Sequence, residues 1–212
     1  MQQKGMVWVI GASGGLGRAT AQAFAQNGWS VIAGARSFAA GTSPLGEGVT
    51  VLPLDVTSEE SCTAFVKKAL GMESRVDVLV CAAAQLVLGS CENTTVDELD
   101  KLLNVNVLGT VRMIQRALPL MRAQKSGKII LFSSINGLLG IPFQSAYTAS
   151  KHALEGYAEC LAMETEPFGI QVCLVEPGDH RGGSSHTRLH AKNETNTVYQ
   201  KAYENTCAII HH

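Results

Sequence analysis

A glycine-rich turn near the N-terminus constrains the fold of this chain more than any other stretch. The apolar run Met6–Ile10, rich in β-branched residues, leads into the turn Gly11-Ala-Ser-Gly-Gly-Leu-Gly17, and residues 18–27 then have the apolar spacing of a helix. A strand, a tight glycine turn and a helix in this order bring backbone amides and the positive end of a helix dipole to one point. The sequence therefore predicts a site for a phosphate or pyrophosphate group at the start of the chain.

The spacing of the glycines narrows the kind of nucleotide site. Gly11, Gly15 and Gly17 follow the pattern G-x-x-x-G-x-G, and no Gly-Lys-Ser/Thr ending follows, which disfavours a nucleoside-triphosphate P-loop. Ser13 and Leu16 lie in the same turn and are predicted to contact the cofactor together with these glycines. A glycine turn that serves only the packing of helix against sheet is the alternative interpretation.

Strand-like and helix-like segments alternate along the chain. The expected strands are residues 6–10, 30–35, 49–54, 76–81, 128–133 and 170–176, and the main helices 18–27, 58–70, 95–124 and 147–167. Parallel strands joined by right-handed helical crossovers form a sheet that is covered on both faces. The pattern predicts an α/β fold, a doubly wound parallel sheet in three layers with six strands, in a single domain over residues 1–212.

The residues that end the second and third strands indicate which dinucleotide binds. An acidic residue after the second strand would bind a ribose 2′-hydroxyl, whereas an arginine would hold a 2′-phosphate. Arg36 stands there and no acid does, so NADP(H) is favoured over NAD(H), with a solvated surface arginine as the alternative. Asp55 and Val56 are predicted to line the adenine pocket, and a helix cap is the alternative role for Asp55.

Tyr147 and Lys151 stand four residues apart in a predicted helix, so their side chains share one face. A nearby ammonium group favours the phenolate form of a tyrosine. Tyr147 would then be a general acid and base near neutral pH. A solvated surface pair is the alternative interpretation of these two residues.

Several motifs taken together resemble the short-chain dehydrogenase/reductase family. They are Gly11-x-x-x-Gly15-x-Gly17, Asp55-Val56, Asn106, Ser134 and Tyr147-x-x-x-Lys151, in this order and spacing. The resemblance covers residues 6–178 and implies a Rossmann-like fold. The stretch Asn104-Val-Asn-Val-Leu-Gly-Thr-Val-Arg-Met113 and the pair Pro142-Phe143 are similar to the hydroxysteroid and retinol dehydrogenase branch of that family.

The resemblance implies an NADP(H)-dependent oxidoreductase that interconverts an alcohol and a ketone or aldehyde by hydride transfer. Tyr147 would exchange a proton with the substrate oxygen, and Ser134 would hydrogen-bond that oxygen. Lys151 would lower the pKa of Tyr147 and bind the nicotinamide ribose. Asn106 would support a water-linked proton relay, with a solvent-facing side chain as its alternative. Further cofactor contacts are implied at Ala83, Pro177 and Gly178.

The chain departs from the family pattern in three places. Cys81-Ala82-Ala83-Ala84 stands where many relatives carry Asn-Asn-Ala-Gly, and Asp179-His180-Arg181-Gly182-Gly183 occupies the place of a threonine that would hold the nicotinamide amide. Residues 179–196 are expected to form a loop and residues 197–210 a short helix, with no seventh strand. These departures motivate an alternative function, a dinucleotide-sensing regulatory protein without turnover.

Composition and charge bear on partners and location. A net charge of −1 gives no support for nucleic-acid binding, and no apolar stretch has the length of a membrane span. The six cysteines form no CxxC pair, which indicates reduced, mostly buried thiols and a cytoplasmic protein without a predicted metal site. The partner is expected to be a small alcohol or carbonyl compound, and the resemblance implies a homodimer or homotetramer.

Overall fold

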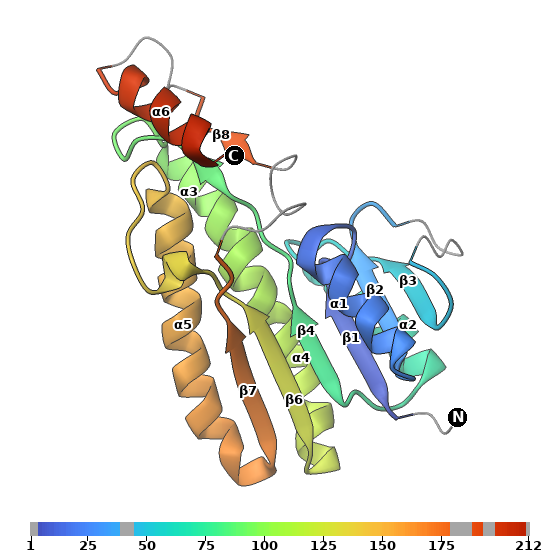
Figure 1. Cartoon of the computed structure of the whole chain (residues 1–212). Helices are drawn as coiled ribbons and strands as arrows, with labels where there is room; N and C mark the ends of the chain where they lie inside the picture. Colours follow the sequence, from blue (N-terminus) through green and yellow to red (C-terminus); the bar gives the residue numbers. More distant parts are fainter. Residues whose placement is uncertain (1–3, 39–44, 179–187, 193–197, 211–212) are drawn as a thin grey trace.

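A six-stranded parallel sheet forms the centre of the structure, a computed structural model (Figure 1). It describes residues 4–38, 45–178, 188–192 and 198–210. The strands of the sheet are β1 (Met6–Ile10), β2 (Ser30–Ala35), β3 (Val49–Pro53), β4 (Val78–Cys81), β6 (Gly127–Phe132) and β7 (Ile170–Val175). Their order is β3-β2-β1-β4-β6-β7, and because every neighbouring pair is parallel, the carboxyl ends meet at one edge.

Helices pack on both faces of this sheet. They are α1 (Gly15–Gln26), α2 (Glu59–Met72), α3 (Val96–Leu103), α4 (Gly109–Gln124) and α5 (Ser145–Thr165). Apolar side chains of α2, α4 and α5 pack with Trp8 and Leu79 on one face, while α1 contributes Ala21 to the cluster around Val9 and Val80 on the other. The predicted α/β fold with a doubly wound, six-stranded parallel sheet is confirmed.

The side on which new strands join the sheet changes between β1 and β4, although all strands stay parallel. From β1 the chain moves outward through β2 and β3, and it then returns to place β4 on the other side of β1. Val9 accordingly pairs with Ala33 on one side and with Val80 on the other. In open α/β sheets, ligands bind in the crevice that this change of side opens at the carboxyl ends of the strands.

The predicted helix over residues 95–124 is interrupted. A capping box joins Thr95 and Glu98 at the start of α3, and a π-helical turn, η1 (Asn104–Leu108), separates α3 from α4. Pro119 lies inside α4, which continues to Gln124. A π-helical turn adds one residue to a helical turn and often marks a functional site.

The described part of the chain after β7 adds no seventh strand to the central sheet. Within the loop expected over residues 179–196, the described residues 188–192 contain a two-residue strand, β8 (Leu189–His190), that pairs with β5 (Val87–Leu88). The short helix expected afterwards is α6 (Gln200–Ile210). None of the described helices is long and apolar enough to cross a membrane.

The prediction that the cysteines are mostly buried is wrong. All six are free thiols, but three are exposed, namely Cys91, Cys160 and Cys173. Cys173 lies on β7, at the edge of the sheet, where the alternate residues Gln171 and Cys173 are exposed and Ile170 is buried. An apolar strand with one such face therefore exposes a cysteine that the sequence pattern indicated as buried.

Candidate active site

A cavity of about 860 Å³ opens at the carboxyl edge of the sheet, within the size range of ligand pockets. Fourteen of the fifteen residues predicted to contact cofactor or substrate line it: Gly11, Ser13, Gly15, Leu16, Gly17, Arg36, Asp55, Val56, Ala83, Ser134, Tyr147, Lys151, Pro177 and Gly178. Asn106, the remaining predicted residue, is not in the lining. The glycine turn and the Tyr147–Lys151 pair thus face one common space.

The glycine turn forms an open cradle at the start of α1. Gly11 has φ 87°, and a Cβ there would lie 2.4 Å from the Ala83 nitrogen. A Cβ at Gly17 would lie 2.3 Å from the Gly11 oxygen, so helix and turn pack closely. No side chain caps the first amides of α1, and its first turn holds no acidic residue. These features fit a phosphate group bound at a helix N-terminus.

Replacing Gly11 with Ala is expected to lower the free energy of unfolding by about 1–3 kcal/mol. Alanine would have to adopt a positive φ, which its side chain disfavours, and its Cβ would clash with the backbone of Ala83. Urea unfolding measures this loss. Gly14→Ala is the matched control, since Gly14 has φ −163° and a Cβ there meets no atom within 4 Å. Equal losses in the two variants would contradict a conformational requirement at Gly11.

The predicted adenine end of the cavity is formed by Arg36 and Asp55. Asp55 is not the cap of α2, because Ser58 fills that role by accepting a hydrogen bond from the Ser61 amide. The Asp55 carboxylate instead accepts from the Thr57 amide at 2.9 Å and from the Thr57 hydroxyl at 2.7 Å. Burial raises the pKa of Asp55, but these bonds and the nearby Arg36 charge outweigh it and hold the pKa below the usual value.

Ser134 follows β6 and begins the short 3₁₀ turn η2 (Ile135–Gly137). Its hydroxyl donates to Asn136 Oδ1 at 3.3 Å and accepts from the Asn136 amide at 3.3 Å. Asn136 Nδ2 donates in turn to Gln144 Oε1 at 3.2 Å and to Thr148 Oγ1 at 3.0 Å. The hydroxyl therefore has a fixed position at the wall of the cavity.

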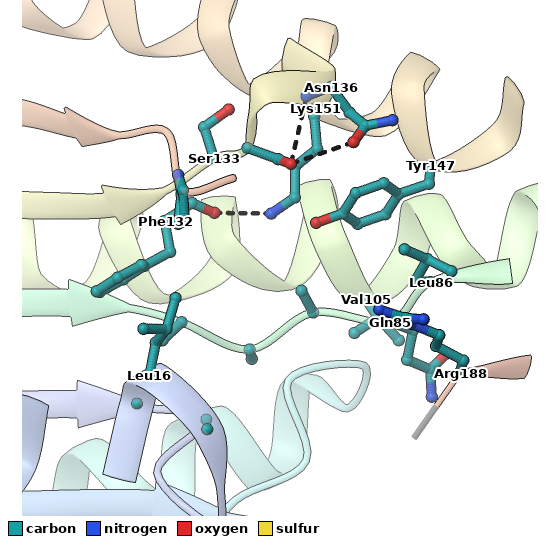
Figure 2. A pocket seen from close by; sticks show the side chains of 18 of the residues that line it. Leu16, Gln85, Leu86, Val105, Phe132, Ser133, Asn136, Tyr147, Lys151 and Arg188 are labelled. Atoms are coloured by element: carbon teal, nitrogen blue, oxygen red, sulfur yellow. Dashed lines mark hydrogen bonds between the residues drawn. The ribbon is translucent and has the colours of Figure 1, made fainter. Parts of the chain in front are cut away.

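Lys151 is 2% exposed, and its amine donates to the Phe132 carbonyl at 2.7 Å. In Figure 2 this amine lies between that carbonyl and the Tyr147 hydroxyl; it is 5.5 Å from the centre of the Tyr147 ring. Burial lowers the pKa of Lys151 to about 8, although the Glu155 charge opposes the change. Burial also raises the pKa of Tyr147, and a hydrogen bond with Ser134 opposes that rise.

The net shift of the Tyr147 pKa is upward, opposite to the predicted reduction by Lys151. The amine is bonded to backbone at Phe132, and the desolvation of the phenol dominates. An isolated buried phenol keeps its proton, because low dielectric disfavours the phenolate. The raised pKa therefore keeps the Tyr147 phenol protonated at neutral pH.

Asn106 lies in the π-helical turn and is 1% exposed, which excludes the solvent-facing alternative. Its carboxamide accepts from the Gln85 amide at 2.7 Å and donates to the Gln85 carbonyl at 2.9 Å. Nδ2 also donates to Ser150 Oγ at 3.0 Å, and Ser150 donates to the Tyr147 carbonyl at 2.7 Å. Asn106 thus joins the segment after β4 to the helix that carries Tyr147.

Sequence reasoning missed several residues of the cavity wall. Asn136 and Gln144 are buried polar residues that flank the predicted site in sequence, two after Ser134 and three before Tyr147. Their closeness to the motifs was a usable signal. Four more lining residues come from the end of the chain, where no motif pointed to them: Arg188, Leu189, Thr206 and Ile209.

One of the departures from the family pattern, Ala84, falls at this cavity. Ala84 lines it and is not among the described non-glycine residues with positive φ, so its methyl group causes no backbone strain. The stretch 179–183, in place of the expected threonine, lies outside the described residues.

Comparisons with known proteins agree with this geometry. A family model described as short chain dehydrogenase matches residues 5–193. The 3-ketodihydrosphingosine reductase of Bacteroides thetaiotaomicron is 40% identical over 186 residues, which is 88% of this chain and 68% of that protein. The human 17-beta-hydroxysteroid dehydrogenase type 1 is 45% identical over 127 residues, 60% of this chain and only 38% of that protein.

Solved structures show the same fold. A short-chain dehydrogenase from Streptomyces avermitilis has a TM-score of 0.90 and 35% identity, and the match covers 100% of this chain and 79% of that one. ElxO, solved with NADP bound, has a TM-score of 0.76 and 32% identity over 84% of this chain and 74% of its own. The motifs, the fold and these matches lead to one conclusion: the chain belongs to the short-chain dehydrogenase/reductase family.

Proposed function

We propose that the protein is an NADP(H)-dependent oxidoreductase that interconverts an alcohol and a ketone or aldehyde, with Tyr147 as the general acid and base. The observation that carries this proposal is the convergence of Ser134, Tyr147 and Lys151 on the cavity that also contains the glycine turn. A dinucleotide held at the glycine turn would supply the hydride. The chain's own residues position the reacting groups and move the proton.

Each catalytic side chain has a task that follows from its position. In the direction of reduction, the buried Tyr147 phenol gives its proton to the substrate oxygen as that oxygen gains negative charge. The Ser134 hydroxyl turns from Asn136 to donate to the same oxygen. The Lys151 ammonium stabilises the phenolate that remains. Asn106 ties the Gln85 backbone to Ser150 on the helix that carries Tyr147, and Ser150 in turn donates to the Tyr147 carbonyl.

The residues for the cofactor fit a dinucleotide. The uncapped amides of α1 would bind the pyrophosphate, and Asp55 and Val56 would line the adenine pocket. Ala83, Pro177 and Gly178 line the cavity between these residues and the catalytic group. Arg36 lies beside Asp55 at the place where a 2′-phosphate would bind, which supports NADP(H).

The substrate is a hydrophobic ketone, aldehyde or alcohol. Several apolar side chains line the cavity, beside polar ones such as Gln85 and Gln144, and could contact a hydrophobic substrate: Leu86, Ile141, Pro142, Leu189 and Ile209. Incubation with NADPH and a panel of hydrophobic ketones and aldehydes, followed by NADPH absorbance, tests the proposal. NADPH binding without oxidation of the cofactor by any compound would favour the alternative of a dinucleotide sensor.

The proposal also includes a cytoplasmic location and assembly into a homo-oligomer. The free state of all six cysteines supports a reducing, cytoplasmic compartment. Assembly into a homodimer or homotetramer is expected through α4 and α5, as the family resemblance implies. Leu108 beside α4 and Met163 on α5 are 48% and 68% exposed, which is compatible with such a contact.

Replacing Arg36 with Asp is expected to reduce the preference for NADPH over NADH by about tenfold or more, because one charge-assisted contact to phosphate is lost and a carboxylate faces the phosphate. The ratio of kcat/KM for the two cofactors measures the effect. Lys68→Asp on the exposed side of α2 makes the same change in net charge away from the cavity. An unchanged ratio in the Arg36 variant would contradict the 2′-phosphate contact.

A further inference from the structure

Glu155 lies one helical turn beyond Lys151 on α5, so the two side chains leave the helix on the same side. The side of α5 where they lie packs against the turn η2, which follows β6. Figure 2 shows the Lys151 amine at the end of β6, close to Phe132 and Ser133. Glu155 is therefore close to the catalytic lysine without lining the cavity.

The carboxylate of Glu155 is partly withdrawn from water. Its Oε1 is buried and has no hydrogen-bond partner among the described residues, and the same holds for Ser133 Oγ. Both oxygens surround Gly137: a Cβ there would lie 2.6 Å from each of them. A side chain at position 137 would occupy the space that the carboxylate now uses. Because one oxygen of this half-buried side chain is withdrawn from water without a hydrogen bond, a positive charge nearby would offset part of the cost of its desolvation.

Lys151 supplies that positive charge. No direct salt bridge joins the two side chains in the described structure, so the Glu155 charge acts through space on the buried Lys151 amine. Burial lowers the pKa of Lys151 to about 8, and the Glu155 charge opposes this change. Because this pKa lies close to neutral pH, the loss of the Glu155 charge would change the fraction of Lys151 that is protonated.

Neighbouring elements contribute no second charge here within the described residues. The turns η1 and η2 contain no titratable side chain. On β7 the titratable group is the exposed Cys173, and on η3 (Glu166–Phe168) it is the exposed Glu166. The ionisable side chains of α3 are exposed, apart from Glu98, which is bonded to Thr95. On α5 itself, Tyr147 is the titratable side chain whose ring lies next to the Lys151 amine. The further ionisable side chains of this helix are exposed, apart from the half-buried Tyr157: His152, Glu159, Cys160 and Glu164.

We propose that Glu155 is a positioning residue that acts through Lys151: its carboxylate helps to keep the catalytic lysine in the ammonium form at neutral pH. The consequence for turnover rests on the proposed function, because the ammonium group stabilises the Tyr147 phenolate there. The charge state of Lys151 itself does not depend on any reaction, and it can be measured without a substrate.

NMR titration of protein labelled at the lysine side chains tests this proposal directly, with the Lys151 signal assigned from the Lys151→Met variant. In the native protein the midpoint is expected near pH 8. In Glu155→Gln, which preserves shape but removes the charge, the midpoint should fall by about half a pH unit or more. Glu155→Asp retains the charge and should keep the midpoint near the native value.

Glu159→Gln is the matched control, because it removes the same charge from an exposed position on the same helix. It should leave the Lys151 midpoint unchanged. A midpoint in Glu155→Gln equal to that of the native protein would overturn the proposal, and so would an equal fall in the Glu159 variant. If the protein turns over ketones, the alkaline limb of the pH profile of kcat should shift to lower pH in Glu155→Gln and not in Glu159→Gln. Absence of turnover in the native protein would contradict the proposed function and leave the NMR result intact.

Discussion

Replacing Tyr147 with Phe is expected to lower kcat for NADPH-dependent carbonyl reduction by about 10²–10⁴-fold. The variant removes one hydroxyl from a ring that lines the cavity and leaves the remainder of the side chain in place. The substrate oxygen then gains charge without a proton donor in reach, and Ser134 alone can only share that charge. Steady-state kinetics with a hydrophobic ketone measure the loss.

Two further measurements separate this chemical role from a structural one. The affinity for NADPH, followed by its fluorescence, should change little, because the glycine turn and Arg36 are untouched. Tyr157→Phe is the matched control, since Tyr157 is on the same helix and does not line the cavity. Turnover retained in the Tyr147 variant, or an equal loss in the Tyr157 variant, would contradict the role of Tyr147.

Replacing Lys151 with Met should also reduce kcat by about 10²-fold or more, and it should weaken NADPH binding as well. The ammonium group is the one positive charge beside the Tyr147 ring among the described residues, and it also faces the cavity. Lys128→Met, at an exposed position on β6, is the control for a lost lysine. Kinetics as in the native protein would contradict the role of Lys151.

Lys151→Met should be no less stable to unfolding than the native protein. This result would distinguish a lysine kept for function from one kept for stability. The pKa of Lys151 is about 8 in the folded protein, against 10.5 for a lysine side chain in water, so burying the ammonium group destabilises the fold below pH 8. Between these values the unfolded chain binds more protons than the folded one. Stability of the native protein should therefore gain a favourable contribution from this group as pH rises from 8 to 10.5, and Lys151→Met should lack that contribution.

Urea unfolding at several pH values compares the two proteins. The difference between their unfolding free energies should be largest, in favour of Lys151→Met, near neutral pH, and should shrink as the pH approaches 10.5. A variant that is destabilised by the same amount at every pH would contradict this account and would indicate that Lys151 serves mainly to hold the Phe132 carbonyl.

The sequence was sufficient for the parts of the molecule that local patterns determine. The six strands follow from short β-branched runs, and the turn from Gly11 to Gly17 follows from residues that must approach backbone closely. Arg36 and Asp55 could be placed because the carboxyl ends of parallel strands meet at one edge. Tyr147 and Lys151 share a cavity because helical spacing puts them on one face.

Other features depend on contacts between distant residues, which no local pattern contains. The π-helical turn around Asn106 contains no glycine or proline that would mark it in the sequence. The Asn106 carboxamide hydrogen-bonds to Gln85 and Ser150, which are 21 and 44 positions away. The pairing of β5 with β8 joins two-residue strands that have too few residues to show a period. The raised pKa of Tyr147 likewise reflects burial, which helical spacing does not reveal.

The most direct test of the central claim is a single isotope measurement. NADPH that carries deuterium at the reactive position of nicotinamide C4 is incubated with the native protein and a hydrophobic ketone, and the alcohol is analysed by mass spectrometry. One deuterium on the carbinol carbon is expected for each NADPH consumed, and almost no labelled alcohol is expected with Tyr147→Phe. Binding of NADPH without labelled alcohol from any ketone or aldehyde in the panel would contradict the central claim.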